Sequence, residues 1–149
     1  MPLTEMPLHN SSFAKATRRV AVRLDPLVLI AEDSPDSREM MQLLLESDGC
    51  RVAAADDGSE AIQLALQTLP DLMLIDLELP KLDGLSVVRD LRRRSEFSKV
   101  QIFIVSGHDP TTYRQAALDA GCDDYILKPI NFDRLHKLVE DVRRRARPN

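Results

Sequence analysis

The sequence predicts an α/β fold of the doubly wound type, in which helices cover both faces of one five-stranded parallel sheet. Apolar runs of four or five residues alternate with longer segments of helical periodicity, and this pattern is typical of successive β-α units. Polar residues directly follow several of these runs, at the strand ends where α/β folds place their chemistry. At 149 residues the chain is long enough for one such domain and too short for two ordinary ones.

The first β-α unit has clear boundary signals. An apolar run at residues 27–31 predicts the first strand. Ser34 is suited to cap the helix that follows, Pro35 to occupy its first position, and Gly49 to end it. The apolar face of this helix is expected to consist of Met40, Met41, Leu44 and Leu45.

The second and third units follow the same scheme. A short strand is expected near residues 51–54, and the helix after it begins at the turn 57–59 and stops at Pro70. The apolar run 72–75 predicts the third strand. Gly84 then introduces the third helix, which ends in a group of arginines, and cations are favourable at a helix C-terminus.

The last two units complete the sheet. The fourth strand is expected at residues 101–105, and the helix after it opens at Pro110 and ends at Gly121. Residues 125–127 predict the fifth strand and residues 132–145 the fifth helix. The inward-facing residues of this last helix are expected to be Leu135, Leu138, Val139 and Val142.

The chain ends differ from this regular part. Residues 1–25 mix Pro, Ser, Thr, Asn and basic residues without a sustained period, so we expect a flexible N-terminal extension. Within it, residues 14–24 could form a short helix or strand. The domain is expected at residues 26–146 and a short C-terminal tail at residues 147–149.

Composition argues against several classes of function. Charged residues make up 30% of the chain and the net charge is -4, which argues against direct nucleic-acid binding. No apolar stretch reaches the roughly 18 residues that a membrane span needs, and the N-terminus lacks a signal-peptide layout. A cytoplasmic protein without a membrane partner is therefore expected. Cys50 and Cys122 lack metal-type spacing and are expected to be reduced thiols.

Five polar residues at strand ends carry the chemistry. Glu32 and Asp33 follow the first strand, Asp76 the third, Ser106 the fourth and Lys128 the fifth. Because parallel strands bring these ends to one edge, two or three carboxylates lie together, and their mutual repulsion demands a cation. Oxygen ligands at an open rim suit Mg²⁺, which prefers to share its shell with a phosphate.

The other polar groups fit phosphoryl transfer. Lys128 can place a positive charge on phosphoryl oxygens and Ser106 can donate a hydrogen bond to another of them. Asp76 is left as the nucleophile, because a carboxylate that attacks phosphorus gives an acyl phosphate. It needs no general base, since an aspartate is ionised at neutral pH.

In sequence order, these motifs resemble the receiver domain of two-component response regulators. The resemblance covers about residues 26–146 and implies a flavodoxin-like (βα)5 three-layer sandwich. Each motif alone is weak, but the ordered set, with each member after its own predicted strand, is highly specific. The motifs are Glu32-Asp33, Asp76 with Leu79-Pro80-Lys81-Leu82-Asp83-Gly84, Ser106-Gly107, and Tyr125-Ile126-Leu127-Lys128-Pro129.

The resemblance implies a role for each acidic residue. Asp76 would be the phosphoacceptor, which takes a phosphoryl group from a histidine kinase or a phosphotransfer protein. Asp33 and Asp76 would bind Mg²⁺ directly, the backbone carbonyl of Glu78 would be a third ligand, and Glu32 would act mainly through water.

It also implies how the signal is passed on. Ser106 and Lys128 would contact the phosphoryl oxygens, and Tyr125 would be an aromatic switch that turns inward when Ser106 moves toward the phosphate. The Lys128-Pro129 bond is usually cis in this family. Glu78 and His108 occupy positions where the family varies and where phosphoryl lifetime is adjusted. The readout surface would be the fourth helix, fifth strand and fifth helix.

The expected function is that of a stand-alone response regulator, which is a switch rather than an enzyme. It would bind an unknown downstream protein or relay phosphate, and any pairing of two copies is expected to be weak. Two alternatives stay open. One is a phosphohydrolase with an aspartyl nucleophile, although Leu79-Pro80 follows Glu78 where such enzymes carry another signature. The other is a receiver-shaped interaction module that is never phosphorylated.

Overall fold

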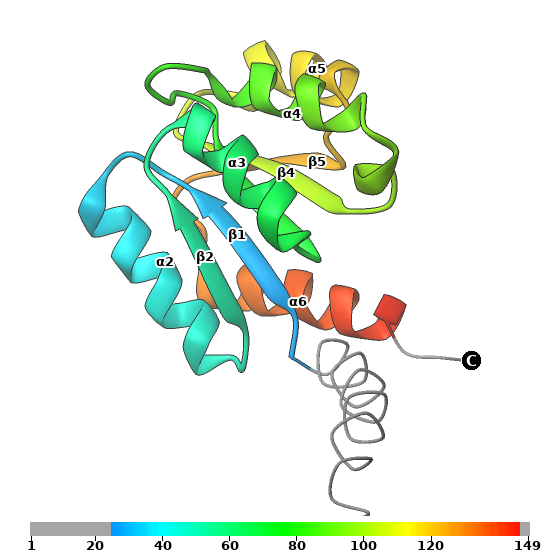
Figure 1. The fold of residues 1–149 in the computed structure, drawn as a ribbon. Coiled ribbons are helices and arrows are strands. Elements are labelled where there is room, and N and C mark those ends of the chain that lie inside the picture. The colour runs from blue at the N-terminus through cyan, green and yellow to red at the C-terminus, as the bar shows by residue number, and fades with distance from the viewer. Residues whose placement is uncertain (1–24, 147–149) are drawn as a thin grey trace, which may run out of the picture.

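The computed structural model describes residues 25–146, whose five strands form one parallel sheet in the order β2-β1-β3-β4-β5 (Figure 1). The predicted fold class is confirmed. Strand β3 lies at the centre of the sheet and pairs with β1 on one side and β4 on the other. The strands are β1 (Leu27–Ala31), β2 (Arg51–Ala55), β3 (Leu72–Asp76), β4 (Gln101–Ser106) and β5 (Asp124–Leu127).

Helices cover both faces of the sheet. Helices α2 and α6 lie on one face, and α3, α4 and α5 lie on the other, so the domain has three layers (Figure 1). The helices are α2 (Pro35–Ser47), α3 (Gly58–Thr68), α4 (Gly84–Arg92), α5 (Pro110–Ala120) and α6 (Phe132–Ala146), and a 3-10 turn, η2 (Ser95–Phe97), follows α4. Among residues 25–146, none of these helices combines the length and the apolar character that a membrane span requires.

Side-chain caps fix where four of the helices begin. The Ser34 hydroxyl accepts a hydrogen bond from the Ser37 amide at 3.5 Å, at the start of α2. Carboxylates do the same for α3, α4 and α5, with acceptor distances of 2.8 to 2.9 Å. These caps satisfy amides that have no partner inside the helix. The capping acids are Asp57, Asp83 and Asp109.

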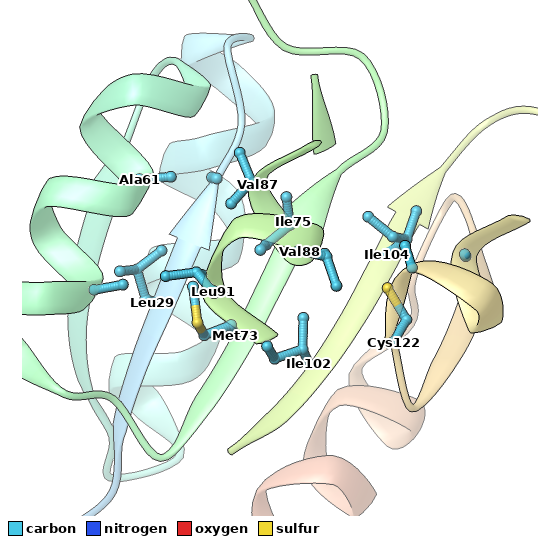
Figure 2. Packing of buried hydrophobic residues seen from close by; sticks show 14 of the residues in the cluster. Leu29, Ala61, Met73, Ile75, Val87, Val88, Leu91, Ile102, Ile104 and Cys122 are labelled. Carbon is cyan, nitrogen blue, oxygen red and sulfur yellow. The ribbon is translucent and has the colours of Figure 1, made fainter. Parts of the chain in front are cut away.

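Two apolar clusters, one on each face of the sheet, make up the core. The larger lies under α3, α4 and α5, where side chains of β1, β3 and β4 meet those of the helices (Figure 2). The smaller lies under α2 and α6 and contains all four residues that were predicted to face inward from α6. Cys50 and Cys122 are free thiols within these clusters, as expected. Burial raises the pKa of Cys50 to about 11 and that of Cys122 to about 12.

One prediction about side-chain orientation was wrong. Met40 was assigned to the apolar face of α2, but 61% of its surface is exposed, whereas Met41 and Leu45 are buried. Residues four apart share a helix face, so the stripe that contains Met41 and Leu45 turns Met40 toward solvent. The expectations for residues 1–24 and the tail 147–149 fall on residues outside the described part of the chain.

Arg92 joins several elements at the end of α4. Its guanidinium donates to the carbonyl of Gly121 at 2.8 Å, to the carboxylate of Asp123 at 3.0 Å and to the carbonyl of Phe97. The side chain is only 18% exposed. Arg92 therefore links α4 to the η2 turn, to the end of α5 and to the start of β5.

Candidate functional site

Strand register brings the predicted site residues to one edge of the sheet. Ala31 pairs with Ile75, so the residues that follow β1 lie beside Asp76 at the end of β3. Asp76 pairs with Val105, and Ser106 pairs with Leu127 on the next strand. The carboxyl ends of β1, β3, β4 and β5 therefore surround one point, with Asp76 on the central strand.

Three carboxylates meet at this point. Glu32, Asp33 and Asp76 each offer an oxygen atom, and these atoms all lie within 4.8 Å of one another. They differ in exposure: Glu32 is buried, Asp76 is partly buried and Asp33 is exposed. Such a group is costly unless a cation compensates it. The strand-end prediction for these acids is confirmed in its placement.

Lys128 supplies a positive charge from the far side of the site. Its ammonium group lies 2.5 Å from Glu32 Oε1 and 3.5 Å from Asp76 Oδ2. The Lys128-Pro129 peptide bond is cis, as the family resemblance implies. The second Glu32 oxygen accepts from the Ser34 amide at 3.2 Å. The two oxygens of the Glu32 carboxylate are thus bound by two different groups, the Lys128 ammonium and the Ser34 amide. The Asp76 carboxylate also lies close to it.

These contacts shift the pKa values of Asp76, Glu32 and Lys128 in different directions. Burial and the negative charge of Glu32 raise the pKa of Asp76 to about 6. Burial would also raise the pKa of Glu32, but the hydrogen bonds from Lys128 and the Ser34 amide outweigh it and lower that pKa. The pKa of Lys128 is raised because its contacts with Glu32 and Asp76 outweigh burial. The combined cost of burial and of the neighbouring Glu32 charge therefore falls on the ionised form of Asp76.

The loop between β3 and α4 is held tightly against its surroundings. The Gly84 amide donates to the Leu77 carbonyl at 2.9 Å, and a Cβ atom at Gly84 would lie 2.3 Å from the Asp76 carbonyl oxygen. On the other side, a Cβ atom at Gly58 would lie 1.8 Å from the Leu82 carbonyl oxygen. Only glycine allows such close approach at these two points.

Ser106 and Tyr125 are connected through His108. Ser106 is buried, and its hydroxyl accepts from the His108 amide at 3.0 Å. Tyr125 is buried as well, and its hydroxyl donates to the His108 carbonyl at 2.8 Å. The predicted switch tyrosine therefore points inward in this structure. The imidazole of His108 contacts the Glu78 carboxylate across the mouth of the site.

Sequence reasoning missed one residue of this site. The Arg38 guanidinium, one turn into α2, donates to the Glu32 backbone carbonyl at 2.9 Å. This contact ties the first turn of α2 to the end of β1. An arginine at this point of an amphipathic helix gives no signal that separates it from an ordinary surface cation, so the sequence pattern could not identify it.

Comparisons with known proteins agree with this geometry. The family model described as the response regulator receiver domain matches residues 28–140. The response regulator MprA of Mycobacterium leprae is 34% identical over 122 residues, which cover 82% of this chain and 53% of that protein. MprA of Mycobacterium avium is 34% identical over 121 residues, which cover 81% of this chain and 52% of that protein. The chain spans about half the length of these curated relatives.

Solved structures resemble the whole described domain. One is the receiver domain of sensor histidine kinase PA1611 from Pseudomonas aeruginosa, which has a magnesium ion coordinated in its active site cleft. It superposes with a TM-score of 0.74 at 29% identity, and the match covers 80% of this chain and 98% of that chain. The chemotaxis response regulator CheY4 of Vibrio cholerae gives a TM-score of 0.73 at 27% identity, covering 79% and 98%. Together with the match to the family model, these findings show that the chain belongs to the response regulator receiver domain family.

Proposed function

We propose that this receiver domain accepts a phosphoryl group on Asp76 from a histidine kinase or a phosphotransfer protein, in a reaction that depends on Mg²⁺. The transfer then changes the binding of a downstream protein or passes the phosphate onward. The observation that carries the proposal is the meeting of Glu32, Asp33 and Asp76 within 4.8 Å with the ammonium group of Lys128 beside them. Family membership supports the same role.

The residues present fit a magnesium ion. All three acids offer hard oxygen donors, which Mg²⁺ prefers. Burial and the negative charge of Glu32 raise the pKa of Asp76, so a cation at this point would favour its ionised form. Asp33 and Asp76 would hold the ion directly, with the Glu78 backbone carbonyl as a third ligand and Glu32 acting through water. When bound, Mg²⁺ neutralises negative charge on the carboxylates and on the phosphoryl oxygens.

The chain's own residues would carry the transfer. A carboxylate oxygen of Asp76 attacks phosphorus, and the new O–P bond forms as the P–N bond to the donor histidine breaks. The donor imidazole leaves with the bonding electrons. Lys128 would turn from Asp76 toward a phosphoryl oxygen, and the hydroxyl of Ser106 would donate a hydrogen bond to another. Such preorganised donors act by stabilising charge where it develops.

Phosphorylation would act by changing the populations of two arrangements of Ser106 and Tyr125. The phosphoryl group favours the arrangement in which Ser106 approaches it and Tyr125 is buried. Helix α5, strand β5 and helix α6 then form the readout surface. Glu78 and His108 are candidates for setting the phosphoryl lifetime, because both side chains lie at the mouth of the site.

Chemical labelling tests this function directly. The protein is incubated with acetyl phosphate or phosphoramidate in Mg²⁺ or in EDTA, and the acyl phosphate is located by hydroxylamine trapping and mass spectrometry. We expect one base-labile phosphoryl group on residue 76, formed only with Mg²⁺ and absent from Asp76→Asn. Asp119→Asn, an exposed change on α5, is the matched control and should be labelled normally. Absence of an adduct from these donors and from any histidine kinase would contradict the proposal.

A further inference from the structure

His108 is the meeting point of four contacts around the site. Its amide donates to the Ser106 hydroxyl at 3.0 Å and its carbonyl accepts from the Tyr125 hydroxyl at 2.8 Å. Its imidazole Nε2 contacts Glu78 Oε1, and its ring lies against that of Tyr113 with centroids 5.3 Å apart. The two residues that would change arrangement on phosphorylation are therefore both bound to the backbone of His108, while its side chain is bound elsewhere.

The contact with Glu78 joins two separate loops. Glu78 lies two residues after Asp76, in the loop that leads from β3 to α4, and His108 lies two residues after Ser106, in the loop that leads from β4 to α5. A phosphoryl group on Asp76 would draw the second loop toward the first through the Ser106 hydroxyl. The Glu78–His108 bridge already connects the same two loops without a phosphoryl group.

We propose that the Glu78–His108 bridge is a positioning contact that favours the inward arrangement of Tyr125 in the unphosphorylated protein. The inference rests on the proposed function, since it concerns the switch of the same site. In this structure the bridge coexists with a buried Tyr125 and with a Ser106 hydroxyl bound by the loop. Both side chains act through the position of the His108 backbone, and neither has to touch the reacting atoms.

The size of the effect follows from exposure. The Glu78 side chain is 72% exposed and the His108 side chain 45% exposed. Pairs of this kind change an equilibrium constant by up to about fivefold. The bridge therefore biases the equilibrium between the two arrangements without locking it. A chain that lacks the bridge would have Tyr125 inward in a smaller share of molecules before phosphorylation, and phosphorylation would then change that share by a larger factor.

Fluorine NMR with 3-fluorotyrosine measures this bias. The chain has two tyrosines, Tyr113 and Tyr125, so Tyr113→Phe assigns the spectrum. The position of the Tyr125 resonance is recorded without a donor and again with beryllofluoride and Mg²⁺, for wild type, Glu78→Ala, His108→Ala and the double variant. Glu96→Ala removes an exposed acid far from the site and is the matched control. Urea unfolding checks that every variant is folded.

In the absence of beryllofluoride, we expect each single variant to lower the ratio of inward to outward Tyr125 by up to about fivefold relative to wild type. The Tyr125 resonance should therefore lie further from the position that the same variant shows with beryllofluoride. The double variant should move it no further, because both changes remove the same contact. Exchanging the partners, with Glu78→His and His108→Glu together, should restore part of the wild-type position. Glu96→Ala should leave it unchanged.

A Tyr125 equilibrium in Glu78→Ala equal to that of wild type would overturn the inference, as would additive effects of the two alanines. The donor-free spectra are read independently of phosphorylation, so this result stands by itself. Labelling of the same variants with acetyl phosphate distinguishes failure of the bridge inference from failure of the proposed function. Normal labelling with an unmoved Tyr125 equilibrium refutes the bridge alone, whereas an unlabelled wild type refutes the proposed function.

Discussion

Replacing Asp76 by Asn should stabilise the metal-free protein. The pKa of Asp76 rises from an ordinary 3.8 to about 6, through burial and the charge of Glu32. One pKa unit corresponds to about 1.36 kcal/mol, so the ionised carboxylate costs the folded state up to about 3 kcal/mol at neutral pH. The site opens to solvent at the sheet edge, and screening reduces this to about 1–2 kcal/mol. Asparagine keeps the shape and removes the charge.

The pH dependence gives this prediction a definite sign. Between pH 3.8 and about 6 the folded protein holds a proton on Asp76 that the unfolded chain has lost, so wild-type stability falls as pH rises through this window. The gain in free energy of unfolding from Asp76→Asn should be close to zero below about pH 4 and should reach its full size above about pH 6.

Urea unfolding in EDTA, followed by far-UV circular dichroism, measures the difference at several pH values. Adding Mg²⁺ should then narrow or reverse the gap, because wild type alone keeps the full set of carboxylates. If Asp76→Asn has equal or lower stability at pH 7 in EDTA, the assignment of the repulsion to Asp76 is wrong.

Three further substitutions test other parts of the structure. Lys128→Met removes the ammonium group 2.5 Å from Glu32 and should cost about 1–3 kcal/mol at pH 7. This cost should shrink only as the pH falls through the lowered pKa of Glu32, where the carboxylate takes up a proton. Labelling with acetyl phosphate should fall at least tenfold. Arg92→Met leaves three acceptors without their donor and should cost about 2–4 kcal/mol in urea unfolding, with labelling retained. Gly84→Ala places a Cβ atom 2.3 Å from the Asp76 carbonyl oxygen; it should cost about 1–3 kcal/mol and slow labelling, and normal stability would show that the loop relaxes freely.

Much of the fold follows from local signals in the sequence. Short apolar runs predict the strands because a parallel sheet buries both faces, and capping residues such as Ser34 and Gly121 fix helix ends because they satisfy otherwise unpaired backbone groups. The acidic site was predictable for a geometric reason. Parallel strands share one carboxyl edge, so residues that follow different strands must meet there. Glu32, Asp33 and Asp76 do so.

Other features depend on contacts that no local pattern encodes. Two adjacent methionines in α2 fit the same helical period until the packing of the sheet decides which one turns inward, and Met40 was therefore misassigned. Arg92 looks like any cation at a helix end, because its acceptors come from segments up to 31 residues away. Glu78 and His108 were each placed near the site, but their pairing depends on the paths of two loops.

The contact between Lys128 and Glu32 spans 96 residues of sequence and joins the end of the last strand to the end of the first. A contact of this span is entropically costly to form before the intervening elements are in place. The acidic site is therefore complete only when β5 is in place. A chain that is still on the ribosome, or one whose last β-α unit has opened, would present Asp76 without its lysine. Under the proposed function, a chain could then be phosphorylated efficiently only when the whole domain is folded.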